Sequence, residues 1–157
     1  MVSSIKCTNC SFPSNKSASS IDLAGPLPET VNGNRYILLA VEAFSGFPMP
    51  IPLKTKTAEE TAQALVTHVF SIFGSPSQIL SDQGGNFDAD LMKEVLKIYG
   101  IYKLRTAALH ASANGRVERF ILTLKEHLKF MVNKEQSNWD QVLPLILQAY
   151  RAAVHSS

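Results

Sequence analysis

The segment RYILLAVEAF, from Arg35 to Phe44, is a nearly continuous run of apolar residues. Such a run is typical of a strand that is buried on both faces of a sheet. A strand of this kind needs a neighbouring strand at each edge, because its backbone N–H and C=O groups are withdrawn from water. Upstream, the segment SSIDLAGPLP (19–28) predicts one such neighbour, which ends at Gly25-Pro26.

The segment FPMPIPL (47–53) predicts the other neighbour and also its place in the sheet. Its apolar residues alternate with Pro48, Pro50 and Pro52. Backbone N–H groups at alternate positions of a strand point to the same side, and proline has no N–H, so all three missing donors fall on one side. We therefore expect an edge strand whose blunted side faces outward.

Helices and strands alternate in the rest of the chain. A helix is predicted between a capping box at Thr57 and Glu60 and the breaker Gly74-Ser75-Pro76. The segments SQILSD (77–82) and IYKLRTA (101–107) predict two more strands. A second helix is expected from about Asp88 to Tyr99, with Gly100 as its stop and with four residues facing inward: Leu91, Met92, Val95 and Leu96. A long helix is expected from about Arg116 to Asn133. A last helix is expected from about Trp139, and it contains Pro144. The pattern predicts an α/β fold, a five-stranded mixed sheet flanked by helices.

The composition favours one soluble domain. The chain has 157 residues, of which 45% are hydrophobic, and a formal charge of +2, which is too small to indicate a nucleic-acid partner by itself. No apolar run approaches the roughly 18 residues that span a bilayer, and the N-terminal residues have no secretory pattern. We therefore expect no membrane partner and a nuclear or cytoplasmic location. Residues 1–19 have the composition of a linker, and residues 20–157 are expected to form the domain.

Cys7 and Cys10 form a C-x2-C pair within the predicted linker. In a reducing compartment such a pair suggests half of a metal site more than a disulfide. Zinc takes four ligands, however, and the four histidines all lie far downstream at no finger-like spacing (His68, His110, His127 and His155). We therefore expect two free thiols and no tightly bound zinc in this chain.

Three acidic residues occupy positions suited to a metal site. Asp22 lies inside a predicted strand, where an unpaired carboxylate would be costly, Asp82 ends another strand, and Glu118 opens the predicted long helix. If the three converge, they can hold two Mg²⁺ or Mn²⁺ ions, which prefer carboxylate oxygens and stabilise both oxygens of an in-line phosphoryl displacement. Position alone leaves alternatives open, since Asp82 also fits a turn at Gly84-Gly85 and Glu118 also fits the dipole of a helix N-terminus.

Five blocks occur in a fixed order along the chain: IDLAGPLP, YILLAVEAFSG, SDQGGNF, ANGRVERFILTLK and AYRAAVHSS. With them the chain resembles the catalytic core of retroviral and retrotransposon integrases, most closely those of gypsy-type LTR retrotransposons and of host genes derived from them. Intervals of 59 residues between Asp22 and Asp82 and of 35 between Asp82 and Glu118 match the family's Asp, Asp-35-Glu triad. The resemblance implies a ribonuclease H-like fold and a catalytic, metal-binding role for these three acids, with Mg²⁺ or Mn²⁺ as cofactor.

The resemblance also implies the partners and the extent of the chain. The partners would be DNA, both element ends and target, and further copies of the same chain. The segment CTNC (7–10) is similar to the Cys half of the family's His-His-Cys-Cys zinc module, whose histidines would precede this chain. The family's C-terminal DNA-binding region would follow it, so we expect a fragment of a longer polyprotein or a truncated reading frame.

Three departures from the family pattern surround the triad. His110-Ala111-Ser112 stands where the family commonly has His-Pro-Gln, so a residue with free φ replaces one with fixed φ. Ile121 and Leu122 stand where the family usually has Asn and a polar or basic residue, and Glu42 replaces a common Asp. A retained triad in altered surroundings fits either a divergent active element or a host gene kept for binding.

The predicted long helix carries a local basic surface. The stretch from Arg116 to Lys134 has two acidic residues, Glu118 and Glu126, and five basic ones: Arg116, Arg119, Lys125, Lys129 and Lys134. Lys125 follows Glu118 by seven residues, about two helical turns, so both occupy nearly the same face. We expect Lys125, with Arg116 and Arg119, to contact DNA phosphates near the metals. A solvated helix face is the simpler explanation for Lys129 and Lys134.

Three other residues each have a functional and a structural explanation. His110 and Asn114 are expected in a loop beside the site, where they would either position the DNA end or be ordinary loop residues. Trp139 is expected to be a packing anchor between the last two helices more than a base-stacking group.

The predicted function is integrase-type polynucleotidyl transfer. Water would attack a phosphodiester near the 3′ end of element DNA, and the freed 3′-OH would then attack target DNA. The alternative is a catalytically silent, integrase-derived module that binds nucleic acid or protein. A nuclease of the same fold acting on RNA–DNA hybrids is disfavoured, because the matching blocks are integrase-like outside the triad as well.

Overall fold

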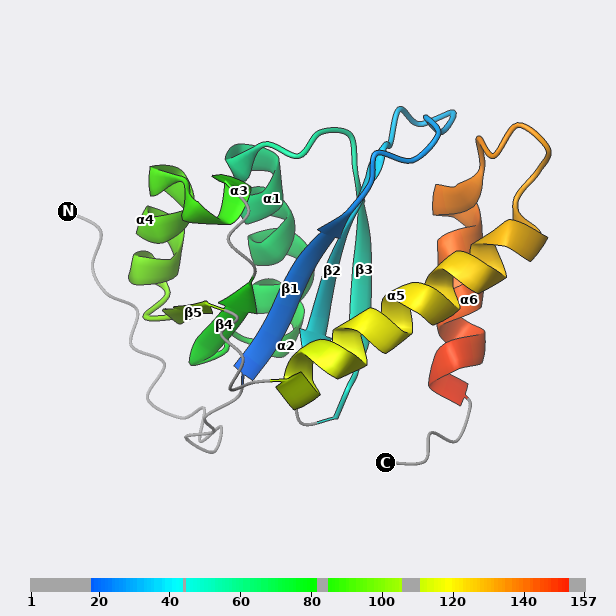
Figure 1. Cartoon of the computed structure of the whole chain (residues 1–157). Coiled ribbons are helices and arrows are strands. Elements are labelled where there is room, and N and C mark those ends of the chain that lie inside the picture. The colour runs from blue at the N-terminus through cyan, green and yellow to red at the C-terminus, as the bar shows by residue number, and fades with distance from the viewer. Residues whose placement is uncertain (1–17, 44, 82–84, 106–110, 153–157) are drawn as a thin grey trace.

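A computed structural model of the chain describes residues 18–43, 45–81, 85–105 and 111–152, and at 86, 105, 111–118 and 130 it describes only the backbone. Figure 1 shows a sheet in these residues with helices on both sides. Cys7 and Cys10, and with them the zinc remnant and residues 1–17 of the predicted linker, lie outside the described residues, as do Asp82 and His110. Of the helices described, none is both long and apolar enough to cross a membrane.

The sheet has the five predicted strands in the order β3-β2-β1-β4-β5. They are β1 (Ala18–Ala24), β2 (Tyr36–Glu42), β3 (Pro48–Leu53), β4 (Gln78–Ser81) and β5 (Tyr102–Arg105). β1, β2 and β3 form an antiparallel meander, whereas β4 pairs in parallel with β1 and β5 in parallel with β4. The predicted five-stranded mixed sheet is therefore confirmed.

β3 is an edge strand, as its prolines predict. Met49 and Ile51 pair with Ala40 and Leu38 of β2, and Pro50 pairs with Leu39. Because only the residues between the prolines carry an N–H group, these residues must supply the donors toward β2, and the prolines leave the outer side without donors. The strand is thus built to pair on one side only.

The first long helix is not uniform. It begins as α1 (Ala58–Leu65), widens into the π-helical segment η1 (Val66–Phe70) and ends as α2 (Ser71–Phe73) before Gly74, whose φ is 80°. Thr57 caps its start by accepting a hydrogen bond from the Glu60 backbone N–H at 3.3 Å. The Glu60 carboxylate accepts instead from the backbone N–H groups of Lys54 and Thr55, at 2.8 and 2.7 Å, so the reciprocal half of the expected capping box is replaced.

The second predicted helix is divided in two. The short α3 (Gly85–Asp88) is followed by α4 (Asp90–Ile98), because Ala89 between them is extended, with ψ at 147°. Met92 and Leu96 are buried as predicted, but Leu91 is 47% exposed, so its predicted inward position is wrong. α4 packs along the line of Met92 and Leu96, and Leu91 lies about 100° away from Met92 around the helix.

α5 (Ala111–Met131) starts five residues earlier than predicted, and α6 (Trp139–Ala152) runs through Pro144. The prediction of a loop at Asn114-Gly115 is wrong, since both residues lie inside α5. A glycine inside a helix costs only about 1 kcal/mol relative to alanine, which the packing of a 21-residue helix offsets. Glu118 is consequently the eighth residue of α5 and does not open it.

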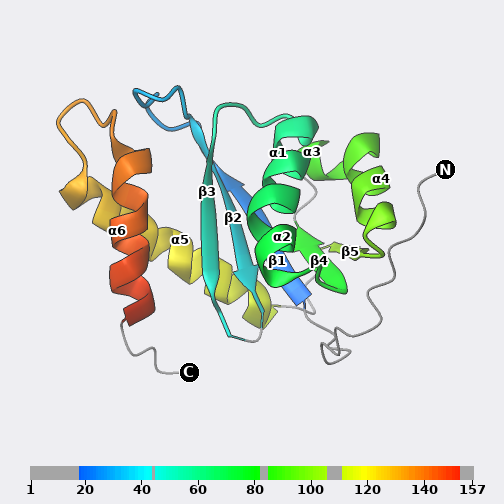
Figure 2. The same cartoon turned by 180° about the vertical axis from the view of Figure 1, so that it is seen from behind.

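Two cores lie on opposite faces of the sheet. One packs β2 through Leu38 and Ala40 against α1 and α4, and the other packs it through Ile37, Leu39 and Val41 against α5 and α6. Figures 1 and 2 show α5 crossing one face, and α1 with α2 covering the other. Both faces of β2 are therefore buried, as its continuous apolar run predicts.

Trp139 belongs to the second core. Its side chain is 2% exposed and packs in one cluster with residues of α5 and α6, and its indole Nε1 donates to the Pro28 carbonyl at 2.7 Å. The expected packing role is confirmed.

Candidate functional site

Asp22 lies in the fifth position of β1 and is half-buried. It pairs with Leu39 of β2, and residues paired across antiparallel strands share a face of the sheet. Leu39 belongs to the core beneath α5 and α6, so Asp22 lies on that same face. Its neighbour Ile21 packs in the opposite core. The Asp22 Oδ1 accepts a hydrogen bond from the Leu23 backbone N–H at 2.7 Å, which gives one oxygen of this half-buried carboxylate a donor.

The end of β4 lies beside Asp22. Ser81, the last residue of β4, pairs in parallel with Ile21, and its side chain is 1% exposed. Asp82 follows Ser81 in the sequence as Asp22 follows Ile21, but Asp82 lies outside the described residues. The structure therefore brings together the two residues that directly precede the two aspartates.

The third acid, Glu118, lies on the helix that covers this face. α5 contacts β1 and packs through Phe120 and Leu124 into the core that contains Leu39. The dipole of a helix acts mainly within its first turn, so the position of Glu118 in the third turn argues against a simple dipole role. The Glu118 side chain is outside the described atoms, and its convergence with Asp22 stays a prediction.

The described side chains contain no group of three His, Cys, Asp or Glu residues that could hold a metal ion. Two of the three predicted ligands, Asp82 and Glu118, are not among the side chains described. Of the three predicted ligands, only the Asp22 side chain is described. It is a half-buried carboxylate, and carboxylate oxygen is the donor that a hard cation such as Mg²⁺ prefers.

The predicted DNA contacts divide into two groups. Arg119 and Lys125 are exposed on α5, as phosphate contacts must be. Asn114 and Arg116 lie in α5 with side chains that are not described, and His110 lies outside the described residues. Leu122, which lies between Arg119 and Lys125, is 62% exposed, so an apolar side chain interrupts this basic surface.

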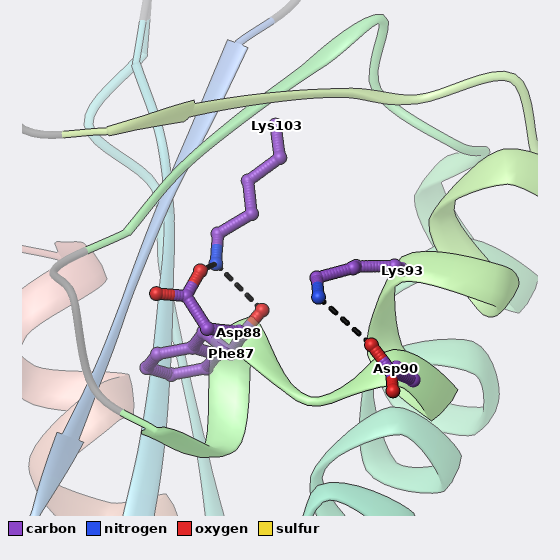
Figure 3. Close-up of polar contacts among 5 residues, drawn as sticks. All are labelled: Phe87, Asp88, Asp90, Lys93 and Lys103. Carbon is purple, nitrogen blue, oxygen red and sulfur yellow. Dashed lines mark hydrogen bonds and ion pairs between the residues drawn. The ribbon is translucent and has the colours of Figure 1, made fainter.

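The structure also contains an ion pair that the sequence reasoning missed. Lys103 of β5 donates to the Asp88 Oδ1 and to the Phe87 carbonyl oxygen, each at 2.5 Å (Figure 3). The side chains of Lys103 and Asp88 are only 16% and 31% exposed. The only sequence signal is a lysine at an internal position of a predicted strand, and its partner lies 15 residues upstream. This contact fixes α3, the first described element after Asp82.

A second missed cluster lies at the opposite end of the fold. Thr30, Asn32 and Asn34, in the connection between β1 and β2, all donate to the Asp140 Oδ2, at 2.9, 2.9 and 2.7 Å. Burial opposes ionisation of Asp140, but the hydrogen bonds from Asn32, Asn34 and Thr30 outweigh it and hold the pKa of this carboxyl below its ordinary value. The cluster joins the β1–β2 connection to the first turn of α6.

Comparisons with known proteins agree with this architecture, although no family model matches the chain. The chain is 26% identical over 120 residues to the retrovirus-related Pol polyprotein from transposon 412 of Drosophila melanogaster, an alignment that covers 76% of this chain and 10% of that polyprotein. It is 34% identical over 121 residues to the Pol polyprotein of Radiation murine leukemia virus (strain Kaplan), which covers 76% of this chain and 20% of the relative. The chain thus spans a small part of these relatives.

Solved structures decide the fold. The catalytic core domain of BIV integrase superposes with a TM-score of 0.72 at 20% identity, over 91% of this chain and 88% of that one. The fold is that of a retroviral-type integrase catalytic core. The HTLV-2 integrase catalytic core domain in complex with magnesium, in its dimeric form, gives a TM-score of 0.69 at 21% identity over 90% of each chain. The predicted ribonuclease H-like class of this integrase-like core is confirmed.

Proposed function

We propose that this integrase-like core transfers polynucleotide ends by metal-dependent phosphoryl transfer, processing the 3′ end of element DNA and joining it to target DNA. The observation that carries the proposal is the parallel pairing of Ile21 with Ser81, each followed directly by an aspartate, on a sheet whose Asp22 face is covered by α5. The relationship to Pol polyproteins supports the polynucleotidyl transferase class.

Asp22, Asp82 and Glu118 are the residues that would hold the metal ions in this proposal. Bound Mg²⁺ or Mn²⁺ would supply Lewis-acid stabilisation of the attacking and leaving oxygens of a phosphodiester. The role of the chain would be to hold the three carboxylates in fixed positions. β1 does this for Asp22 through its pairing on both sides and through the hydrogen bond from Leu23 N–H. The HTLV-2 integrase core bound to magnesium supports the choice of metal.

The exposed basic residues of α5 would bind the DNA. Lys125 lies two turns beyond Glu118, and Arg119 is the residue directly after Glu118. Both basic residues can therefore hold a phosphate near the proposed metal site. Arg116 is proposed to contact a DNA phosphate as well, and His110 and Asn114 are proposed to position the DNA end. We also propose that the chain acts as a homo-oligomer, which the dimeric form of the HTLV-2 core supports.

A catalytically silent binding module is the second candidate, because Leu122 exposes an apolar side chain on the face proposed to meet DNA. The discriminating experiment is strand transfer of a pool of duplex oligonucleotides with free 3′-OH ends into plasmid DNA, with Mn²⁺ present. Asp82→Asn should abolish the reaction. Asp90→Asn is the matched control, since Asp90 is an exposed acid eight residues further along that pairs only locally with Lys93. No product from wild type would favour the silent module. Equal product from wild type and Asp82→Asn would show that the reaction does not need Asp82 and would overturn its proposed role.

A further inference from the structure

A pocket of about 300 Å³ lies at the end of the sheet where β1 begins and β2 ends. Figure 2 shows α2 beside this end of the sheet, next to the start of β1. The pocket has a polar side formed by Ser19, Glu42 and Ser45 and an apolar side that includes Phe47, Met49 and Phe73. Its volume is at the lower end of the range for small-molecule sites, about 300–1,000 Å³, so it suits a small ligand or a single side chain of a larger one.

Ser19 is the buried polar residue of this pocket. It pairs with Ile79 of β4, a core residue, so its side chain lies on the sheet face that α1 and α4 cover. The residue is only 6% exposed, yet among the residues that the structure describes no group forms a hydrogen bond with its hydroxyl. A hydroxyl that is withdrawn from water without a partner is unfavourable. A ligand in the pocket would supply that partner.

Glu42 gives the pocket a carboxylate. It pairs with Ser19 across antiparallel strands, so both side chains lie on the same face of the sheet. Its Oε2 accepts hydrogen bonds from the backbone N–H and from the hydroxyl of Ser45, both at 2.6 Å, and these bonds hold the carboxylate in position. The proton of the Ser45 hydroxyl is thereby committed to Glu42. A carboxylate can accept about four hydrogen bonds, so this side of the pocket offers acceptors and a negative charge.

The opposite side of the pocket is apolar and partly open. Met49 is 7% exposed, whereas Phe73 is 54% exposed, and the Phe73 ring centroid lies 5.5 Å from that of Phe47. Gly74 also lines the pocket, and no atom of another segment lies within 4 Å of the position that a Cβ would take there. These walls suit an apolar body, and an aromatic ring face also attracts a cation.

We propose that this pocket binds a cationic amine with an apolar body, either a free arylalkyl amine or the basic side chain of a peptide. The cationic nitrogen would donate to the Glu42 carboxylate and to the Ser19 hydroxyl oxygen, and the apolar body would lie against Met49 and Phe73. The charge of Glu42 disfavours anions, and a purely apolar ligand would leave the Ser19 hydroxyl without a partner.

The inference goes beyond the proposed function and does not depend on it. Asp22 pairs with Leu39 on the face beneath α5 and α6, whereas Ser19 lies on the face covered by α1 and α4. The pocket is therefore separate from the proposed metal site.

The experiment uses the methionines of the full chain as reporters. The chain is labelled with ¹³C-methyl methionine and titrated at neutral pH with benzylamine, whose amine is then protonated, and with benzyl alcohol, which has the same ring and a neutral head group. Met49 lines the pocket, whereas Met92 belongs to α4 and Met131 to the end of α5, so their signals are internal controls. We expect benzylamine to shift the Met49 signal saturably at millimolar concentration, as befits a ligand of this size, and benzyl alcohol to bind about tenfold more weakly.

Two pairs of variants test the polar side of the pocket. Glu42→Gln can still accept hydrogen bonds from Ser45 but lacks the charge, so it should weaken benzylamine binding about tenfold and leave benzyl alcohol binding unchanged. Its matched control is Glu59→Gln, an exposed acid of α1, which should bind as wild type does. Ser19→Ala should weaken benzylamine binding about threefold or more. Its control is Ser20→Ala, a buried serine on the opposite face, which should leave binding unchanged.

A second titration distinguishes the two sources of the amine. Nα-acetyl-arginine amide and Nα-acetyl-lysine amide present basic side chains as a peptide does. Tighter binding of either compound than of benzylamine would identify a peptide side chain as the ligand, and the reverse order would identify a free amine.

Three outcomes would overturn the proposal. One is a Met49 signal that benzylamine does not move, and another is an equal shift of the Met49, Met92 and Met131 signals. The third is equal affinity of wild type for benzylamine and benzyl alcohol, which needs no variant and shows a pocket that binds apolar bodies without regard to charge. Asp82→Asn should bind benzylamine as wild type does, so failure of this proposal and failure of the proposed function are distinguishable.

Discussion

Ile21 of β1 and Ser81 of β4 are paired in parallel register, and each is followed in the sequence by an aspartate. Parallel pairing gives the two strands the same chain direction and places Ser81 beside the residue that precedes Asp22. The parallel pairing follows from the topology. A crossover formed by α1, η1 and α2 connects β3 to β4, and it lets β4 run in the same direction as β1.

The first prediction concerns Asp82. Replacing it with Asn keeps the ability to form an Asx-turn but removes the charge. Wild type should be stabilised by Mn²⁺ through mass action, by about 2.7 kcal/mol at a hundred times the dissociation constant. Asp82→Asn should fold and lose most of that stabilisation, which urea titrations with and without Mn²⁺ would measure. A variant that responds to Mn²⁺ as wild type does would leave Asp82 a turn residue.

The second prediction concerns Asp140, which accepts hydrogen bonds from Thr30, Asn32 and Asn34. Asp140→Ala leaves three donors without their shared acceptor and should lower the free energy of unfolding by about 1–3 kcal/mol in urea titrations at pH 7. Gln141→Ala, at the exposed neighbouring position, is the control and should have little effect. A change below 0.5 kcal/mol, roughly the size expected of ordinary surface substitutions, would contradict a stabilising role for the cluster.

The third prediction is the pH dependence of the same group. The pKa of Asp140 is lowered in the folded chain, so the unfolded chain binds the proton more tightly. The resulting stabilisation is complete above the ordinary aspartate pKa of about 3.9 and is lost as pH falls through the folded-state value. The difference in unfolding free energy between wild type and Asp140→Asn should therefore shrink as pH is lowered from 6 to 3. A difference that stays constant over this range would show that the charge of Asp140 contributes nothing.

The fourth prediction concerns Arg151 on α6, which covers the edge strand. Its guanidinium lies 4.1 Å from the Phe47 ring centroid and donates to the Pro48 carbonyl at 2.7 Å. Arg151→Ala should lower the free energy of unfolding by about 1–2 kcal/mol through loss of the cation–π contact and of the charged hydrogen bond. Gln148→Ala, at an exposed position one turn earlier, should be close to neutral. Equal urea midpoints for the two variants would contradict the expected contribution of Arg151.

The sequence predicts the sheet well, because the signals that place the strands are local. The apolar run of β2 requires burial on both faces, and the prolines of β3 require an edge, so neither conclusion depends on distant partners. The start of α5 could not be predicted in the same way, since Asn114 and Gly115 favour a loop locally and their helical conformation depends on the packing of the whole helix.

The candidate site shows the same limit. The spacing of Asp22, Asp82 and Glu118 is visible in the sequence, but the register that pairs Ile21 with Ser81 is not. Lys103 and Asp88 meet only because β5 lies parallel to β4 and α3 folds back over the sheet. No local pattern encodes a contact that depends on the crossover from β4 to β5, so this ion pair could not be predicted from the sequence.

The last prediction concerns DNA binding by α5. Lys125 is exposed on the helix that bears Glu118, whereas Lys134 lies beyond the end of α5 and is exposed to solvent. Lys125→Ala should weaken binding of duplex DNA and reduce the slope of log affinity against log salt by about 1, because one phosphate contact and its released counterion are lost. Lys134→Ala should change neither quantity. Fluorescence anisotropy at several salt concentrations would measure both, and equal slopes for the two variants would exclude a phosphate contact by Lys125 and count against the proposed DNA surface.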